Sequence, residues 1–181
     1  MGSGDRNSYA KQENPKDALT TMEGNFYDPR LWMIDQRRMI LLVEDDDADA
    51  ELASRAFQKA QVANPLVRVR DGLEALDYLF ARGKYAARDA DDLPVFVLLD
   101  LNIPKISGLK VLEAIRENQR TRCLPVIIHT SSGEEKDRLD AYNHFANSYV
   151  IKPLDYDQFV AATQQLSLYW TGLNEPAPLI P

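Results

Sequence analysis

The chain has 181 residues, of which 45% are hydrophobic, and its formal net charge is −7. This length suits one domain with a proper core plus some additional chain. No apolar run approaches the roughly 18 residues that a membrane-spanning helix needs, so no membrane partner is expected. An acidic domain lacks the basic face that phosphate neutralisation requires, which argues against nucleic acid and favours a protein or small-molecule partner. Cys123 is the only cysteine, which excludes an internal disulfide and a multi-cysteine zinc site.

Residues 1–38 are predicted to form a leader that is largely disordered, because residues 1–25 are polar and show no periodicity. The opening MGSG resembles the remnant of an expression tag, and no apolar stretch of a secretory signal peptide follows. A cytoplasmic location is therefore the default expectation. The more apolar stretch 26–35 is a candidate for docking on the domain or on a partner, although a loose leader is the favoured interpretation.

The ordered domain is predicted to begin near Met39, where short apolar runs start to alternate with amphipathic stretches. The run 39–43 (MILLV) predicts a strand, and residues 48–61 place their apolar side chains on one helical face. The stretch 66–70 (LVRVR) alternates as a half-buried strand does, and a turn then leads into helical spacing over residues 73–80. The polar stretch 82–94 is predicted to be an exposed loop.

The second half of the domain continues this alternation. The run 95–100 (VFVLLD) predicts a strand that is buried on both faces of a sheet. The remaining predicted elements are a helix after Gly108, a strand at 125–130, a helix near 134–145 with Leu139, Tyr142 and Phe145 as its stripe, a strand at 148–151, and a helix from about Asp155. Five strands that alternate with five helices predict an α/β fold with a parallel sheet covered on both faces.

The domain is predicted to span residues 39–170 and to be followed by a tail, residues 171–181. The tail contains three prolines and cannot continue the last helix. Its apolar residues Leu173, Leu179 and Ile180 have little of their own chain on which to pack.

Four of the five predicted strands end at a reactive polar group. Ligands of open parallel α/β sheets bind beyond the carboxyl ends of the strands. The residues found there are Glu44, Asp45 and Asp46 after the first strand, Asp100 after the third, Thr130 at the end of the fourth, and Lys152 with Pro153 after the fifth. Each alone has an ordinary structural explanation, such as a helix cap or a surface lysine, but together they indicate a site.

These side chains form a chemically coherent set. Glu44, Asp45 and Asp100 would crowd negative charge, which is unfavourable unless a cation intervenes. Their oxygen ligands suit Mg²⁺, with Mn²⁺ as the alternative metal. A carboxylate beside such an ion can attack phosphorus, which makes Asp100 the predicted acceptor of a phosphoryl group. Lys152 would then contact a second phosphoryl oxygen, and the Thr130 hydroxyl would donate a hydrogen bond to a third.

Four motifs resemble, in the same order, those of response-regulator receiver domains in two-component signalling: ILLVEDD (40–46), LLDLNIPKISG (98–108), PVIIHT (125–130) and YVIKP (149–153). The resemblance covers residues 39 to about 170. It implies a flavodoxin-like (βα)5 fold, in which a doubly wound parallel sheet has the strand order 2-1-3-4-5.

The resemblance also assigns a role to each residue of the predicted site. The metal would be bound directly by Asp45 and Asp100, through a water by Glu44, where Asp is the commoner residue, and by the backbone carbonyl of Asn102. Asp100 matches the phosphorylated aspartate, Thr130 and Lys152 the switch hydroxyl and the phosphate-binding lysine, Tyr149 the switch aromatic, and Pro153 a proline usually preceded by a cis bond. Ser131 stands beside the phosphoryl pocket, where the family usually has Ala or Gly.

In this family the phosphoryl group comes from the phosphohistidine of a sensor histidine kinase. The resemblance implies that phosphorylation draws Thr130 inward and lets Tyr149 fill the vacated space. The surface formed by residues 134–145, the strand 148–151 and the last helix would then change its affinity for a partner. The protein is not expected to be an enzyme beyond its own phosphorylation and dephosphorylation.

No second domain is expected after Trp170, so the protein would signal by binding or by passing the group to a histidine phosphotransfer protein. The segment 82–94 and the ending SLYWTGLNEPAP also resemble stand-alone regulators of phytochrome-type histidine kinases. In that group a C-terminal extension reaches a second subunit. The tail 171–181 is therefore a candidate dimerisation arm of a homodimer, with a frayed tail as the equal alternative.

Two other functions compete with a phosphorylated switch. A metal-dependent phosphohydrolase of the haloacid-dehalogenase type needs a second Asp two positions after the nucleophile, where this chain has Asn102. A pseudo-receiver that acts only as a scaffold typically loses the acceptor, the acidic pair or the lysine, and this chain keeps all of them. The phosphorylated switch is therefore preferred.

Overall fold

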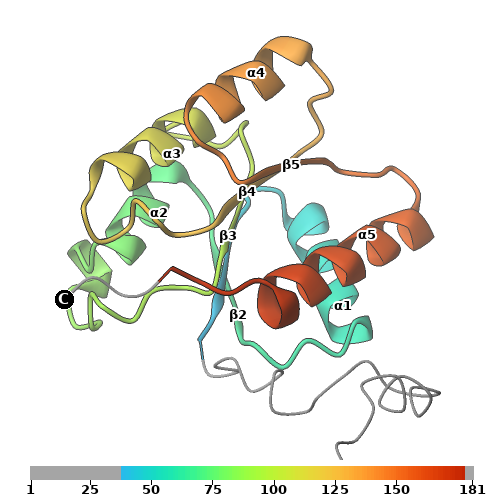
Figure 1. Cartoon of the computed structure of the whole chain (residues 1–181), viewed down its shortest axis with the longest axis horizontal. Coiled ribbons are helices and arrows are strands. Elements are labelled where there is room, and N and C mark those ends of the chain that lie inside the picture. The colour runs from blue at the N-terminus through green and yellow to red at the C-terminus, as the bar shows by residue number, and fades with distance from the viewer. Residues whose placement is uncertain (1–37, 178–181) are drawn as a thin grey trace, which may run out of the picture.

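The computed structural model describes residues 38–177, which form a five-stranded parallel sheet flanked by helices (Figure 1). The strands are β1 (Ile40–Val43), β2 (Leu66–Val69), β3 (Val97–Leu99), β4 (Val126–Thr130) and β5 (Ser148–Ile151). The helices are α1 (Asp47–Lys59), α2 (Gly72–Leu79), α3 (Gly108–Glu117), α4 (Glu135–Asn143) and α5 (Tyr156–Leu168), with a 3-10 turn η3 (Gly83–Tyr85) and a π-helical turn η4 (Tyr169–Leu173). The strand order β2-β1-β3-β4-β5 confirms the predicted flavodoxin-like topology.

Two helical layers cover the sheet, with α2, α3 and α4 on one face and α1 and α5 on the other (Figure 1). Successive residues of β1 alternate between the two cores, since Leu41 and Val43 pack on the first layer and Ile40 and Leu42 on the second. The central strands are therefore buried on both faces, which explains their uninterrupted apolar runs. Because β1 and β3 pair directly, the polar residues that follow these two strands are also brought close together.

Aspartate side chains fix the starts of three helices. Asp46 accepts the N–H groups of Ala48 and Asp49 at 2.8 and 2.9 Å, at the start of α1. Asp71 caps α2 and Asp155 caps α5 in the same way. Such caps each contribute about 1 kcal/mol. Asp46, which follows β1 together with Glu44 and Asp45, therefore belongs to a helix start.

The segment 82–94, predicted to be an exposed loop, is more ordered than its composition suggests. It contains η3, and the Arg88 guanidinium lies 3.8 Å from the centre of the Tyr78 ring. The Tyr85 ring meets the same ring edge-on at 4.9 Å, and Leu93 is buried. Cation–π and aromatic contacts leave no hydrophobic periodicity in the sequence, so a polar segment can be anchored without a visible pattern.

The apolar stripe predicted for the helix near 134–145 exists, but it faces solvent. Leu139, Tyr142 and Phe145 are 61%, 49% and 72% exposed, and α4 ends before Phe145. The residue of α4 that is fully buried is Ala141, whose small side chain lets the helix approach the sheet. Periodicity identified the helix here but not the face that packs.

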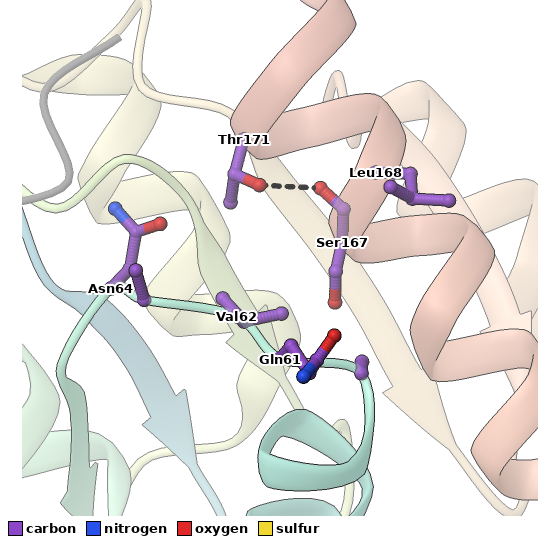
Figure 2. A pocket seen from close by; sticks show the side chains of 8 residues that line it. Gln61, Val62, Asn64, Ser167, Leu168 and Thr171 are labelled. Atoms are coloured by element: carbon purple, nitrogen blue, oxygen red, sulfur yellow. Dashed lines mark hydrogen bonds between the residues drawn. The ribbon is translucent and has the colours of Figure 1, made fainter. Parts of the chain in front are cut away.

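The C-terminal helical segment extends past the predicted boundary at Trp170. η4 continues the helix to Leu173, and the Thr171 hydroxyl donates to the Ser167 carbonyl at 2.7 Å. Figure 2 shows this pair on one wall of a hollow, opposite Gln61 and Asn64. The first proline of the tail stands at position 176, so no proline prevents these extra residues from being helical. The hollow lies beside the chain that enters β2, at the amino ends of the strands.

The predicted leader lies outside the described residues except for Arg38, and so do the docking stretch 26–35 and residues 178–181. Arg38 belongs to the folded domain, because its Nη2 donates to the Pro94 carbonyl at 2.7 Å and its own carbonyl accepts from Asn64 Nδ2 at 2.8 Å. Within residues 38–177, no helix combines the length and hydropathy needed to cross a membrane.

Candidate functional site

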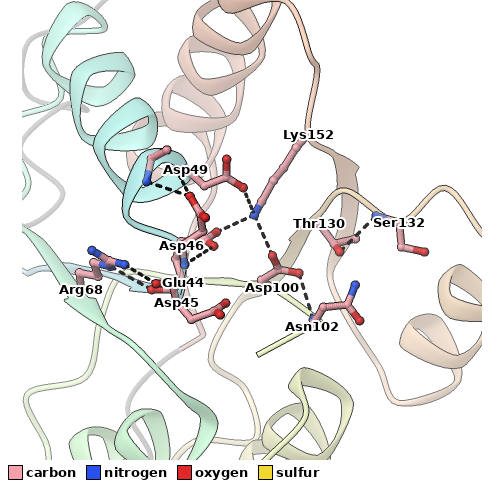
Figure 3. A network of polar contacts seen from close by, with 11 residues as sticks. Glu44, Asp45, Asp46, Asp49, Arg68, Asp100, Asn102, Thr130, Ser132 and Lys152 are labelled. Carbon is pink, nitrogen blue, oxygen red and sulfur yellow. Dashed lines mark hydrogen bonds and ion pairs between the residues drawn. The ribbon is translucent and has the colours of Figure 1, made fainter. Parts of the chain in front are cut away.

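Lys152 lies among three carboxylates at the carboxyl edge of the sheet (Figure 3). Its Nζ donates to Glu44 Oε2 at 2.6 Å, to Asp100 Oδ2 at 2.7 Å and to Asp49 Oδ2 at 2.8 Å. Glu44, Asp100 and Lys152 are each no more than 9% exposed. Glu44 follows β1, Asp100 follows β3 and Lys152 follows β5, so the parallel topology brings together three residues that are distant in sequence.

The cluster holds more negative than positive charge. Three carboxylates contact one ammonium group, so the formal charge is −3 + 1 = −2. Burial raises the pKa of Glu44 above its ordinary value; the hydrogen bond and charge of Lys152 oppose this rise, and the charges of Asp100 and Asp49 add to it. Ionisation of Glu44 is therefore less favourable than that of an ordinary glutamate.

Asp100 behaves differently from Glu44. Burial disfavours its charged form, but the hydrogen bond and charge of Lys152, the Asn102 amide and the Thr130 hydroxyl together lower the pKa of Asp100 below its ordinary value. Lys152 remains protonated, because its hydrogen bonds to Asp100, Asp49 and Glu44 outweigh the effect of burial and raise its pKa. The site therefore presents an ionised carboxylate at the end of a buried strand.

Thr130 and Tyr149 are linked through the segment that follows β4. The Ser132 N–H donates to Thr130 Oγ1 at 3.3 Å, and the Tyr149 hydroxyl donates to the Ser132 carbonyl at 3.0 Å. The Ser132 hydroxyl donates to Asp137 Oδ2 of α4 at 2.6 Å. Thr130 is fully buried and Tyr149 is half-buried. Ser132 therefore connects Thr130 both to Tyr149 and to α4.

The other predicted site residues line the edge of this cluster. The Asn102 N–H donates to Asp100 Oδ1 at 3.1 Å, while its side chain and that of Ser131 are exposed. The bond before Pro153 was expected to be cis, and this expectation is wrong for the structure, because residues 38–177 contain no cis peptide bond. The trans isomer is favoured by about 0.5–1 kcal/mol even before proline.

The predicted metal ligands are only partly gathered. Asp45 is exposed, and no group of three or more Asp, Glu, His or Cys side chains in the described part of the chain forms a metal site. In the structure the Lys152 ammonium lies between the Glu44 and Asp100 carboxylates and donates to both. This is the place where the predicted metal ion would bind. The chemistry of the predicted ligands still fits a divalent cation, because Glu44, Asp45 and Asp100 all offer carboxylate oxygens.

Arg68 binds the main chain of the acidic segment that follows β1 (Figure 3). Its Nε donates to the Glu44 carbonyl and its Nη2 to the Asp45 carbonyl, each at 2.9 Å. Its Nη1 donates to Asp47 Oδ1 at 2.6 Å. The sequence analysis placed Arg68 only in an alternating strand, and the pairing of β1 with β2 accounts for its reach.

Asp49 is the member of the carboxylate cluster that the sequence analysis missed. It lies in the first turn of α1, within an acidic run that gives no sign of which carboxylates turn toward the sheet. His129 of β4 is buried against Phe159, with ring centres 5.4 Å apart. Burial and the nearby Lys152 charge lower the pKa of His129 to about 4, so the ring is neutral.

Comparisons with known proteins agree with this geometry. The model of the response regulator receiver domain family matches residues 40–164. The probable methanogenesis regulatory protein FilR2 of Methanothrix harundinacea is 39% identical over 141 residues, which cover 77% of this chain and 88% of that protein.

Two solved structures are similar in fold and sequence. The phosphorylated cyanobacterial phytochrome response regulator RcpA has a TM-score of 0.73 and 32% identity, covering 78% of this chain and 99% of that one. The Mn²⁺-bound form of response regulator Rcp1 has a TM-score of 0.71 and 30% identity, with the same coverage of 78% and 99%. A sheet of matching topology, the residues at its carboxyl edge and the family match over residues 40–164 lead to one conclusion: the chain belongs to the response regulator receiver domain family.

Proposed function

We propose that this protein is a single-domain response regulator that accepts a phosphoryl group on Asp100 from the phosphohistidine of a sensor histidine kinase. The observation that carries the proposal is the environment of Asp100. Its carboxylate is 7% exposed, yet its pKa is lowered through Lys152, the Asn102 amide and Thr130. An ionised, positioned carboxylate at a sheet edge is a suitable nucleophile toward phosphorus.

The transfer conserves atoms and charge in a single displacement. An Asp100 carboxylate oxygen forms a bond to phosphorus, and the bond between phosphorus and the donor imidazole nitrogen breaks, so the histidine leaves with the electron pair. The Lys152 ammonium then balances charge on the phosphoryl oxygens, and the Thr130 hydroxyl donates a hydrogen bond to another of these oxygens.

A divalent cation would be held by Glu44, Asp45, Asp100 and the backbone carbonyl of Asn102. Mg²⁺ is the proposed metal, with Mn²⁺ as the alternative, and the Mn²⁺-bound form of the similar protein Rcp1 supports this assignment. When bound, the cation offsets negative charge on the phosphoryl group. The Lys152 ammonium donates to both Glu44 and Asp100. Breaking its bond to Glu44 would free the Glu44 carboxylate for the cation.

The proposed signal is a change of surface rather than a reaction on a substrate. A phosphoryl group on Asp100 would draw the Thr130 hydroxyl inward and break the contact between Thr130 and the Ser132 amide. Tyr149, whose hydroxyl is bonded to the Ser132 carbonyl, and α4, which Ser132 contacts through Asp137, would then shift. The surface so altered consists of α4, β5 and α5.

The proposed partner is a phytochrome-type histidine kinase in the cytoplasm, and the similarity to the phytochrome response regulator RcpA supports this choice. A homodimer formed with help from the tail 171–181 is part of the same proposal. The alternative fate of the phosphoryl group is onward transfer from Asp100 to a histidine phosphotransfer protein. Loss of label from the regulator and its appearance on such a carrier would identify that fate.

The test is labelling of the full chain by radioactive acetyl phosphate, and by a phosphorylated phytochrome-type kinase, with and without Mg²⁺. We expect label on the wild-type protein only with Mg²⁺, and none on Asp100→Asn. The matched control is Asp157→Asn, which changes an aspartate of α5 whose side chain is 87% exposed, and this variant should label normally. Label retained on Asp100→Asn would exclude Asp100 as the acceptor.

A further inference from the structure

Arg68 connects β2 to the segment that carries the first two acids of the site. It pairs with Leu42 of β1 in the sheet register, and its side chain is 22% exposed. The last ladder bond between these strands joins the Glu44 N–H to the Val69 carbonyl at 3.0 Å. Beyond this bond the chain leaves the sheet toward α1. There the carbonyls of Glu44 and Asp45 accept hydrogen bonds from the Arg68 guanidinium instead of from the main chain of β2.

The guanidinium binds this segment at three points. Two nitrogens reach the Glu44 and Asp45 carbonyls, and the third reaches the Asp47 carboxylate (Figure 3). A planar guanidinium holds several acceptors in fixed relative positions, which a lysine ammonium on a flexible stem does not do. Arg68 therefore restrains both the position and the orientation of the main chain from which the Glu44 and Asp45 side chains project.

Arg70 provides an internal comparison two residues further along the chain. Its Nη1 also contacts Asp47 Oδ1, at 2.7 Å, but no bond from Arg70 to the Glu44 or Asp45 carbonyl is found. Its side chain is 59% exposed. Both arginines thus place a positive charge beside the Asp47 carboxylate. Of the two, only Arg68 also binds the main chain of the acidic segment.

We propose that Arg68 is a positioning residue for the cation site, because it fixes the main chain from which the Glu44 and Asp45 side chains project. This inference rests on the proposed function, because it assigns Arg68 a role in the cation-dependent site described there. Residues that orient metal ligands from outside the coordination shell typically change metal affinity by 10–100-fold when they are replaced.

The charge and the geometry of Arg68 predict opposite effects on cation affinity. Removal of a positive charge near a cation site favours binding of the cation, so a purely electrostatic role predicts tighter binding after neutralisation. A positioning role predicts weaker binding, because the carboxylates lose their arrangement. The sign of the change therefore separates the two explanations.

The experiment is a titration of the full-length, unphosphorylated protein with Mn²⁺, in which electron paramagnetic resonance measures the free ion. The variants are Arg68→Gln, Arg68→Lys and Arg70→Gln, and thermal unfolding by circular dichroism checks that each is folded. We expect Arg68→Gln to weaken Mn²⁺ binding about tenfold. Arg68→Lys should recover little of this loss, and Arg70→Gln should bind as tightly as the wild type or slightly more tightly.

Labelling by acetyl phosphate provides a second measurement. The Mg²⁺ concentration for half-maximal labelling should rise about tenfold in Arg68→Gln, with the rate at saturating Mg²⁺ less affected. Mn²⁺ affinity in Arg68→Gln equal to that of Arg70→Gln would overturn the positioning role and leave the proposed function intact. A wild-type protein that neither binds Mn²⁺ nor labels on Asp100 would overturn both proposals. If Arg68→Gln does not fold, Arg68→Lys becomes the test. A Mn²⁺ affinity of Arg68→Lys equal to that of the wild type would then overturn the positioning role.

Discussion

Lys152 is the residue on which the charge balance at the sheet edge depends. It contacts Glu44, Asp49 and Asp100, and 7% of its side chain is exposed. Isolated charges are costly to bury, and a buried ion pair contributes little relative to an apolar pair of similar shape. Removal of one partner of a buried ion pair, in contrast, strongly destabilises the fold, because the remaining charge is left buried and unpaired.

Replacement of Lys152 by Met should lower the free energy of unfolding by about 3 kcal/mol at pH 7 without divalent cations, because three carboxylates lose the ammonium group that contacts them. Urea unfolding followed by circular dichroism measures this change. Lys110→Met is the matched control, since Lys110 pairs with Glu113 on the surface and is 69% exposed, so no measurable change is expected. Added Mg²⁺ should restore part of the loss in Lys152→Met, because a bound cation stabilises the folded state. Equal stability of Lys152→Met and the wild type would contradict this charge balance.

The same variant should show a characteristic pH dependence. In the wild type, the lowered pKa of Asp100 stabilises the folded state above the unfolded-state pKa of this group, and this stabilisation is lost as the pH falls. The raised pKa of Glu44 has the opposite effect, because it destabilises the folded state as the pH rises. In Lys152→Met both folded-state pKa values should lie above the unfolded-state values. The folded protein then binds extra protons, so the stability deficit should shrink between pH 7 and pH 4. Urea unfolding at several pH values tests this, and a deficit independent of pH would contradict it.

At the scale of the elements, the connection from β3 to α3 lies in close contact with its neighbours. The Gly108 N–H donates to the Leu101 carbonyl at 3.0 Å, and the Gly72 N–H at the start of α2 donates to the Pro104 carbonyl at 3.3 Å. A Cβ atom on Gly108 would lie 2.2 Å from the Asp100 carbonyl oxygen. Asp100 and the start of α3 are thus in direct contact.

Gly108→Ala should destabilise the protein by about 3 kcal/mol, because the new methyl group meets backbone that cannot move without displacing Asp100. The labelling rate should fall as well, since the Asp100 carboxylate moves with its main chain. Gly133→Ala is the control: the Cβ atom there would lie 3.8 Å from the nearest atom, Ile151 Cδ1, and the variant should unfold and label normally. Urea unfolding and acetyl phosphate labelling measure the two effects, and normal labelling of Gly108→Ala would show that the contact is not needed.

At the scale of the whole molecule, several large apolar side chains are exposed on α4, just after it and on β5. This surface includes Leu139, Phe145 and Ile151, and Leu154 in the connection to α5 is fully exposed. Contiguous exposed apolar side chains mark interaction sites more often than single ones do. The surface also includes α4, which Ser132 contacts through Asp137, and β5, which carries Tyr149.

The double variant Leu139→Ser and Phe145→Ser should reduce self-association of the phosphorylated protein, because it removes two of the most exposed apolar side chains of this surface. Sedimentation velocity with acetyl phosphate and Mg²⁺ measures the change. Leu73→Ser, at a position 45% exposed on α2, is the control and should leave self-association unchanged. Equal sedimentation of the double variant and the wild type would contradict self-association through these side chains, and truncation after Trp170 would then test the tail alone.

Hydrophobic periodicity was sufficient to predict the order and type of the main elements. The runs at 39–43 and 95–100 indicated buried strands because β1 and β3 are covered on both faces, and such strands need no polar side. The position of each polar residue at the end of its run then placed Glu44, Asp100 and Lys152 at one edge, since parallel strands share a direction.

Contacts between residues distant in the sequence were decided by the tertiary structure alone. The sequence contained Asp49 and Arg68 but gave no sign that one turns toward Lys152 and the other binds the Glu44 and Asp45 carbonyls. It also did not specify that Leu139 faces solvent while Ala141 packs inside. Periodicity depends on neighbours along one element, so the sequence by itself determined the strands, the helices and the edge at which the acids gather. Charge pairing and the choice of buried face depend on which elements meet in space, and only the packed fold decided them.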